Sequence, residues 1–129
     1  MKVFISQPMT GLTEEEIWDT RQEAIQNILD IYGEDTEILN SFCCDEYRNY
    51  VEYNLEGGEG SSIKIKSWEI YWLSYSLNYL AEADLIWFVD GWQHSKGCTI
   101  EHMCASLYGI ETEYETLATR KDGSYKYGK

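Results

Sequence analysis

The sequence predicts a single three-layer α/β domain, in which helices cover both faces of a mainly parallel sheet of four to five strands. Short apolar segments alternate with helical patterns along the chain. The run from Asp84 to Asp90 is almost continuously apolar, as is typical of a strand buried on both faces. The chain has 129 residues, of which 43% are hydrophobic, and this suits one domain with a real core. We expect residues 1–115 to form this domain and residues 116–129 to form a polar C-terminal tail.

The first half of the domain shows clear helix and strand signals. Residues 2–6 predict the first strand. Thr13 then opens a helix, because Thr13 and Glu16 have the spacing of a capping box. Gly33 ends this helix. Residues at helical spacing are expected to form one apolar face, and they are Ile17, Arg21, Ala24, Ile25, Ile28, Leu29 and Tyr32. Residues 36–40 predict the second strand.

The segment 41–62 has the least regular pattern. Its first half is compatible with a short helix, whereas residues 57–62 are rich in glycine and serine. A connection this long in a small domain is usually a functional loop or a disordered segment. We therefore expect a mobile loop, with its glycine-rich part acting as the hinge of a lid or as a slack linker.

Residues 64–83 predict a long helix with two apolar stripes. A helix that is apolar on more than one face is buried on more than one side. The second side is expected to be a subunit interface, where Trp and Tyr are enriched, so the sequence predicts a homo-oligomer. The alternative is a helix buried entirely within one chain.

The segment after Asp90 carries the candidate chemistry. Gly91 and Gly97 bracket a polar loop, and the helix that follows is expected to hold Glu101 on its first turn. Ligands of open α/β sheets bind beyond the carboxyl ends of the strands, and a carboxylate there is a candidate nucleophile or base. The helix macrodipole alone also favours an acidic residue in a first turn. Residues 110–115 predict the last strand.

The net charge of the chain limits the kinds of molecule that it can bind. The formal net charge is −13, with ten Lys and Arg against 23 Asp and Glu, which argues against binding a nucleic-acid polymer or an anionic membrane. A small phosphorylated ligand is compatible with this charge, since helix N-termini hold phosphates through backbone amides. The chain has no apolar run of about 18 residues, so no transmembrane helix is expected. Its first residues enter a strand directly, so we expect no secretory signal and a cytoplasmic location.

Cysteine usage predicts neither disulfides nor a cofactor. Cys43 and Cys44 are adjacent, fit no common disulfide framework and are expected to be reduced. The only residues that resemble a metal-ligand cluster are His94, Cys98, His102 and Cys104. Cys98 and His102 would share a helix face while Cys104 points elsewhere, so a buried thiol is favoured over structural zinc.

Two segments carry a family resemblance. The first is Met1–Gly11, with the sequence MKVFISQPMTG, and the second is residues 83–92 followed by Ser95, Gly97 and Glu101. Together they resemble the nucleoside 2-deoxyribosyltransferase-like family, more closely its small uncharacterised branch common in phages and prophages. The resemblance covers most of residues 1–110. It implies a flavodoxin-like or Rossmann-like domain, usually oligomeric.

The resemblance also implies a reaction. Members of the family cleave N-glycosidic bonds of nucleosides or nucleotides through a glutamate that forms a glycosyl–enzyme intermediate, and Glu101 matches this nucleophile. Ser95 matches a position that is Ser in monophosphate-cleaving members, so a nucleotide ligand is favoured. The chain departs from the family at Phe4, where members carry a tyrosine that hydrogen-bonds the nucleophile. It departs again at Ser76, where members carry an aspartate that contacts the sugar.

Two functions therefore stay open, besides a purely structural role. One is an N-glycosidase or deoxyribosyltransferase that uses Glu101 on a nucleotide. The other is a non-catalytic phage-type binder that sequesters a nucleotide or an ADP-ribose-like signalling molecule. Trp92 and aromatic residues of segment 41–62 are expected to stack on the base. The expected ligand-binding residues are Ser6, Gln7, Pro8, Met9, Gly11, Asn40, Ser76, Asp90, Gly91, Trp92, Ser95 and Gly97.

Overall fold

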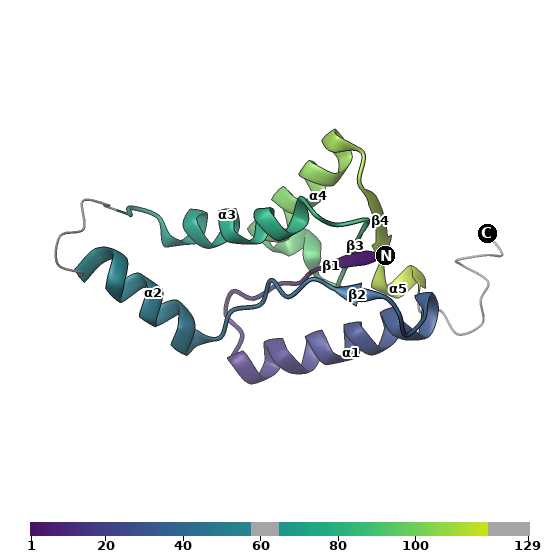
Figure 1. Cartoon of the computed structure of the whole chain (residues 1–129), viewed down its shortest axis with the longest axis horizontal. Coiled ribbons are helices and arrows are strands. Elements are labelled where there is room, and N and C mark those ends of the chain that lie inside the picture. Colours follow the sequence, from purple (N-terminus) through teal and green to yellow (C-terminus); the bar gives the residue numbers. More distant parts are fainter. Residues whose placement is uncertain (58–64, 119–129) are drawn as a thin grey trace.

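The computed structural model describes residues 1–57 and 65–118, and these form an α/β domain around one parallel sheet (Figure 1). The strand order is β2-β1-β3-β4, and every neighbouring pair of strands is parallel. The strands are β1 (Lys2–Ser6), β2 (Glu37–Ile38), β3 (Leu85–Phe88) and β4 (Glu111–Tyr114). The predicted fold class is confirmed: a single domain of three layers and a four-stranded, flavodoxin-like sheet.

The helices lie on both faces of this sheet. They are α1 (Glu14–Tyr32), α2 (Asp45–Gly57), α3 (Trp68–Leu80), the 3₁₀ turn η1 (Trp92–His94), α4 (Lys96–Tyr108) and α5 (Glu115–Ala118). Figure 1 shows α1 on one side of the strands and α3 and α4 on the other. Within the described residues, no helix is both long enough and apolar enough to cross a membrane.

Strand alternation divides the core into two layers. On β1, Val3 and Ile5 pack against α1, while Phe4 packs on the opposite face with residues of α3 and α4. Every residue of Leu85–Phe88 is buried, so β3 is covered on both faces as its apolar run predicted. The central strands therefore hold α1 and α4 in fixed positions on opposite faces.

Local signals at α1 act as predicted. The Thr13 side chain accepts a hydrogen bond from the Glu16 amide, and the Glu16 carboxylate accepts one from the Thr13 amide, which completes the capping box. Gly33 ends the helix with a φ of 107°, in the left-handed region that favours glycine.

The first half of segment 41–62 holds a helix, as its sequence allowed, whereas the mobile glycine-rich half stays a prediction. The helix covers Asp45–Gly57, and the glycine-rich residues 58–62 lie outside the described residues. Contacts with α3 fix the position of α2 in the domain, and these contacts could not be read from the local sequence. Tyr47 packs edge-on against Trp72 of α3, the Arg48 guanidinium lies 5.2 Å from the centre of the Trp72 ring, and the Trp72 indole N–H donates to Glu52 at 3.0 Å.

The same contacts explain the two apolar stripes of residues 64–83. One side of α3 packs on the sheet through Leu77 and Leu80, and Trp72 is covered by α2 within the chain. Burial on two sides thus needs no second subunit, and the homo-oligomer stays a prediction. The helix begins at Trp68 because the Ser67 side chain caps it, and it ends at Leu80. Large apolar side chains are more exposed on α4, at Ile100, Met103, Leu107 and Tyr108.

The domain also extends beyond its expected end at residue 115. Helix α5 covers Glu115–Ala118, and Ala118 is buried against the α1 face of the sheet. Residues 116–118 are therefore part of the domain rather than of a polar tail. Residues 119–129 lie outside the described residues.

Candidate active site

The strand order places a ligand crevice at a definite point. The chain moves from β1 to β2 on one side and then returns to add β3 on the other side of β1. Such a topological switch lies between β1 and β3, and ligands of open α/β sheets bind at the carboxyl ends of those strands. Ser6 ends β1 there, and the loop after β3 leads into α4, which carries Glu101.

Glu101 lies on the face of α4 that is turned toward the sheet. It is the sixth residue of the helix, in the second turn rather than the expected first turn, and it is only 6% exposed. The macrodipole effect fades after the first turn, so it does not account for a carboxylate here. The Ser6 hydroxyl donates a hydrogen bond of 2.6 Å to Glu101 Oε1, which ties α4 to the end of β1.

Burial changes the acidity of this carboxyl group. Loss of hydration raises the pKa of Glu101 to about 7, although the hydrogen bond from Ser6 partly opposes the rise. Both protonation states are therefore populated near neutral pH. A carboxyl group tuned in this way is typical of acid–base and nucleophilic sites.

Cys98 of α4 lies beside Glu101, and the N-cap residue Ser95 lies beside Cys98. The Ser95 side chain caps α4 by accepting a hydrogen bond of 3.3 Å from the Cys98 amide. The Cys98 thiol is buried among Ser6, Ser95 and Glu101, and desolvation is the main cause that raises its pKa. A thiol in such surroundings stays protonated and unreactive, so Cys98 shapes the site without attacking a substrate.

Sequence reasoning had placed Cys98 only in a core or a zinc site. Its spacing of three residues from Glu101 already indicated a shared helix face. Within the described residues, no three or more His, Cys, Asp and Glu side chains are arranged to hold a metal ion. The cysteines Cys43, Cys44, Cys98 and Cys104 are free thiols.

A second network lies on the opposite face of β1. Gln7 is buried, and its amide donates to the Ile17 carbonyl at 3.0 Å and accepts from Arg21 at 3.4 Å. The Arg21 guanidinium also donates to the Leu39 carbonyl at 2.9 Å and is 2% exposed. Burial lowers the pKa of Arg21 to about 10. Gln7 is therefore a tether between α1 and the strand ends, and Arg21, read from the sequence as part of the apolar face, completes it.

The other predicted residues lie around the crevice at different depths. Pro8 and Met9 are half-buried in the loop after β1, while Gly11 turns the chain with a φ of 81°. A side chain at Gly91 would meet Pro8 at 3.8 Å, so the loops after β1 and β3 touch. Gly97 faces α3, since a side chain there would meet Leu73 at 4.0 Å.

Two expected positions lie apart from Glu101 in sequence and in element. Asn40 is exposed two residues beyond the end of β2, whereas Ser76 is half-buried on α3. Neither residue forms the hydrogen bond to Glu101 that Ser6 forms.

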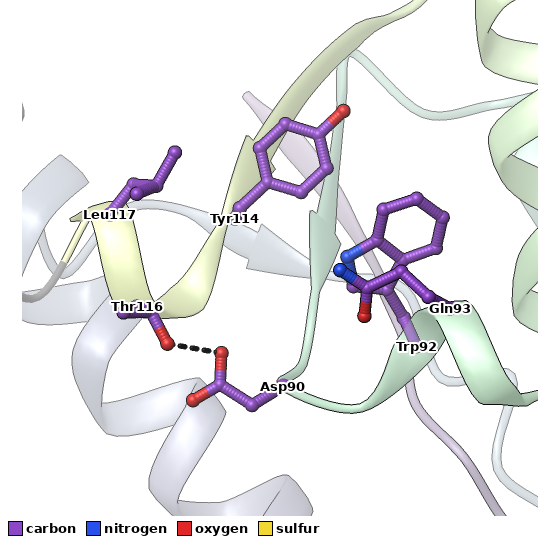
Figure 2. Close-up of a pocket in the computed structure, with 6 residues that line it drawn as sticks. All are labelled: Asp90, Trp92, Gln93, Tyr114, Thr116 and Leu117. Atoms are coloured by element: carbon purple, nitrogen blue, oxygen red, sulfur yellow. Dashed lines mark hydrogen bonds between the residues drawn. The ribbon is translucent and has the colours of Figure 1, made fainter.

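A cavity of about 340 Å³ opens beside this crevice, at the carboxyl ends of β3 and β4 (Figure 2). Asp90 and Trp92 had been predicted to bind a ligand. Gln93 was not singled out within the polar loop, and the β4–α5 residues were missed because the sequence indicated only a strand and a tail there. The lining residues are Asp90, Trp92, Gln93, Tyr114, Thr116 and Leu117.

Comparison with protein-family models, curated proteins and solved structures found no match to this chain. The resemblance to the nucleoside 2-deoxyribosyltransferase-like family therefore stays a prediction. The chemistry of the site has to carry the functional argument.

Proposed function

We propose that this protein processes the N-glycosidic bond of a nucleotide, as an N-glycosidase or deoxyribosyltransferase, with Glu101 as the nucleophile. The observation that carries the proposal is a buried carboxylate, held by Ser6 at 2.6 Å, at the carboxyl end of a central parallel strand. A buried carboxylate costs folding free energy, so its presence at the ligand-binding edge of the sheet favours a catalytic role.

The proposed reaction has two steps. Ser6 holds Oε1, which leaves Oε2 of Glu101 to attack the anomeric carbon. The C–N bond breaks, its electron pair goes to the leaving base, and the base takes a proton from water. A water molecule or a second base then attacks the same carbon and gives up one proton to the solvent. The bond between the sugar and Glu101 breaks with its electron pair returning to the carboxylate. A carboxylate close to the anomeric carbon stabilises the oxocarbenium-like transition state of each step.

Ser6 also supplies the hydrogen bond to the nucleophile that is lost because Phe4 stands where the family carries a tyrosine. Phe4 is 1% exposed and packs in the core, so it offers no hydroxyl to the nucleophile. Ser6 lies two residues further along β1, on the same face of the strand, and donates a hydrogen bond to Glu101. We therefore propose that Ser6 takes the part that the resemblance assigns to a tyrosine at position 4.

The N-terminus of α4 suits the phosphate of such a ligand. The Ser95 oxygen accepts from the Cys98 amide, which leaves its own hydroxyl proton to donate. The amides at the start of a helix favour an anion, and α4 begins at Lys96. A nucleotide could thus place its phosphate at Ser95 and its sugar at Glu101. We further propose that the protein acts in the cytoplasm, where its thiols stay reduced.

The test is base release. The protein is incubated with a mixed pool of nucleotides and ADP-ribose compounds, and free base is followed by chromatography with mass detection. Glu101→Gln should abolish release, while the control Glu111→Gln, at an exposed position of β4, should retain it. Full release by Glu101→Gln would contradict the assignment of the nucleophile.

The second candidate is a non-catalytic binder of a nucleotide or an ADP-ribose-like signal. Ser76 favours it, because a serine on α3 cannot replace the carboxylate that the resemblance expects there. A binder would deplete one compound from solution and return it intact when the protein is denatured. Free base in the same experiment would exclude this function.

A further inference from the structure

We propose that the cavity at the ends of β3 and β4 binds the base of the nucleotide and prefers bases with an exocyclic amino group, such as adenine or cytosine. This inference rests on the function proposed above, because it assigns a part of the same ligand. The cavity measures about 340 Å³, at the small end of the range of small-molecule sites.

One wall of the cavity is aromatic. The rings of Trp92 and Tyr114 line it with their centres 5.7 Å apart, and Leu117 lies on the side away from Trp92 in Figure 2. Flat aromatic surfaces bind the faces of a heteroaromatic ring by stacking, and this contact is tolerant of which base is bound. The wall therefore indicates a planar ligand.

Contacts behind the wall hold it in place. The His102 ring stacks on Trp92 with centres 4.4 Å apart, and its Nε2 is hydrogen-bonded to the Tyr114 hydroxyl at 2.7 Å. Phe88 of β3 packs against both Trp92 and Tyr114. A wall that is already rigid loses little side-chain entropy when a ligand binds.

The opposite edge is polar and acidic. Figure 2 shows the Asp90 carboxylate and the Thr116 hydroxyl joined by a hydrogen bond at the lower side of the cavity, with the Gln93 side chain near Trp92. A carboxylate accepts hydrogen bonds and repels anions. This edge therefore suits the amino group of a base and disfavours a phosphate, especially in a chain with a net charge of −13.

Glu101 is not among the residues that line the cavity, but neighbouring residues connect the two. His102, which supports the aromatic wall, is the residue after Glu101 on α4. Ser6, Phe88 and Tyr114 are aligned across the three neighbouring strands. A sugar at Glu101 would thus have its base directed toward β3 and β4.

Discrimination follows from the acceptor at the edge. Adenine and cytosine would present an amino group to Asp90, whereas hypoxanthine and uracil would present a carbonyl oxygen that the carboxylate repels. Asp90 is exposed at the rim of the cavity, so the preference comes from the repulsive contact between its carboxylate and a carbonyl oxygen rather than from a buried group left unpaired.

Titration calorimetry on the full chain tests the inference, with Glu101→Gln to prevent turnover. The ligands are adenosine, inosine, cytidine and uridine 5′-monophosphates. We expect tighter binding of the amino member of each pair, and the preference should disappear in Asp90→Asn, because an amide can also donate. Tyr114→Leu should weaken every ligand by roughly five- to a hundredfold, the range expected for loss of one base-stacking contact. The control Tyr108→Leu, at an exposed tyrosine of α4, should bind like its parent.

If Tyr114→Leu loses its fold by circular dichroism, Leu117→Trp serves instead, since a larger side chain there fills the cavity. Equal affinity within each pair, unchanged affinity in the cavity variants or no binding of any of the four ligands would overturn the inference. Failure of the proposed function looks different: the wild type would bind with the expected preference but release no base. Base release by the wild type without a preference in binding would overturn the cavity assignment alone.

Discussion

Replacing Glu101 by Gln should stabilise the protein at neutral and alkaline pH while removing its proposed chemistry. Gln resembles the protonated form of Glu, and its carbonyl oxygen can accept the hydrogen bond that Ser6 donates to Oε1. The variant therefore keeps the contact and removes the charge that burial disfavours. A gain in stability with a loss of activity is the expected signature of a functional residue.

The size of the effect follows from the pKa. Burial raises the pKa of Glu101 from 4.5 to about 7, and this shift corresponds to about 3 kcal/mol of differential stability. The folded-state pKa lies above the unfolded value, so the unfolded chain loses its proton first as the pH rises. Below pH 4.5 the wild type carries no penalty, and the penalty grows from there until it is complete above about pH 7.

Urea unfolding followed by far-ultraviolet circular dichroism measures this difference. Between pH 5 and 8.5, the free energy of unfolding of Glu101→Gln minus that of the wild type should rise by about 2–3 kcal/mol. Other titrating groups are common to both proteins and cancel in the difference. Glu111→Gln, which removes a charge at an exposed position, should follow the wild type. If the free energies of unfolding of Glu101→Gln and the wild type changed equally with pH, the claim that the buried Glu101 carboxylate destabilises the fold would be refuted.

Three further predictions follow from the same structure. Ser6→Ala should move the rise of base release with pH upward by about one to two pH units, because it removes a charge-assisted hydrogen bond that lowers the pKa of Glu101; a pH–rate profile with an unchanged midpoint would contradict this. Arg21→Met should lower the free energy of unfolding by about 1–3 kcal/mol, since buried carbonyl acceptors lose their donor; urea unfolding of no lower stability would show that the tether contributes nothing. If residues 64–83 form a homo-oligomer, Ile70→Glu should reduce the mass measured by light scattering, whereas Leu107→Glu on α4 should not. The opposite pattern would show that the interface lies on α4, and a monomeric wild type would show that the predicted homo-oligomer does not form.

Where the sequence predicted well, the signal was local. The first strand needed only its short apolar run, and α1 needed a capping box and a glycine with positive φ. The buried strand β3 was readable because burial on both faces requires an apolar residue at every position. These features depend on neighbours within a few residues.

Where the sequence predicted poorly, the structure depends on contacts with residues that lie far along the chain. The contact between α2 and Trp72 was not predicted, although a short helix in that segment was allowed. The segment expected to be a tail begins with α5, because Ala118 packs on the sheet. The cavity draws on both the loop after β3 and the β4–α5 segment, so no single motif marks it. Arg21 counted as part of an apolar stripe because helical spacing cannot distinguish a buried cation from a hydrophobic residue.

The sequence alone determined the succession of strands and helices along the chain from β1 to β4, the candidate nucleophile Glu101 and the acidic charge that disfavours polyanionic partners. Tertiary structure decided what surrounds that nucleophile. Ser6 lies 95 positions away in the sequence and reaches Glu101 only because β1 and β3 pair side by side and α4 packs across them. Spacing along a chain fixes which residues share a strand or helix face. Desolvation and hydrogen bonding depend on which elements pack together, so the raised pKa of Glu101 could be seen only in the fold.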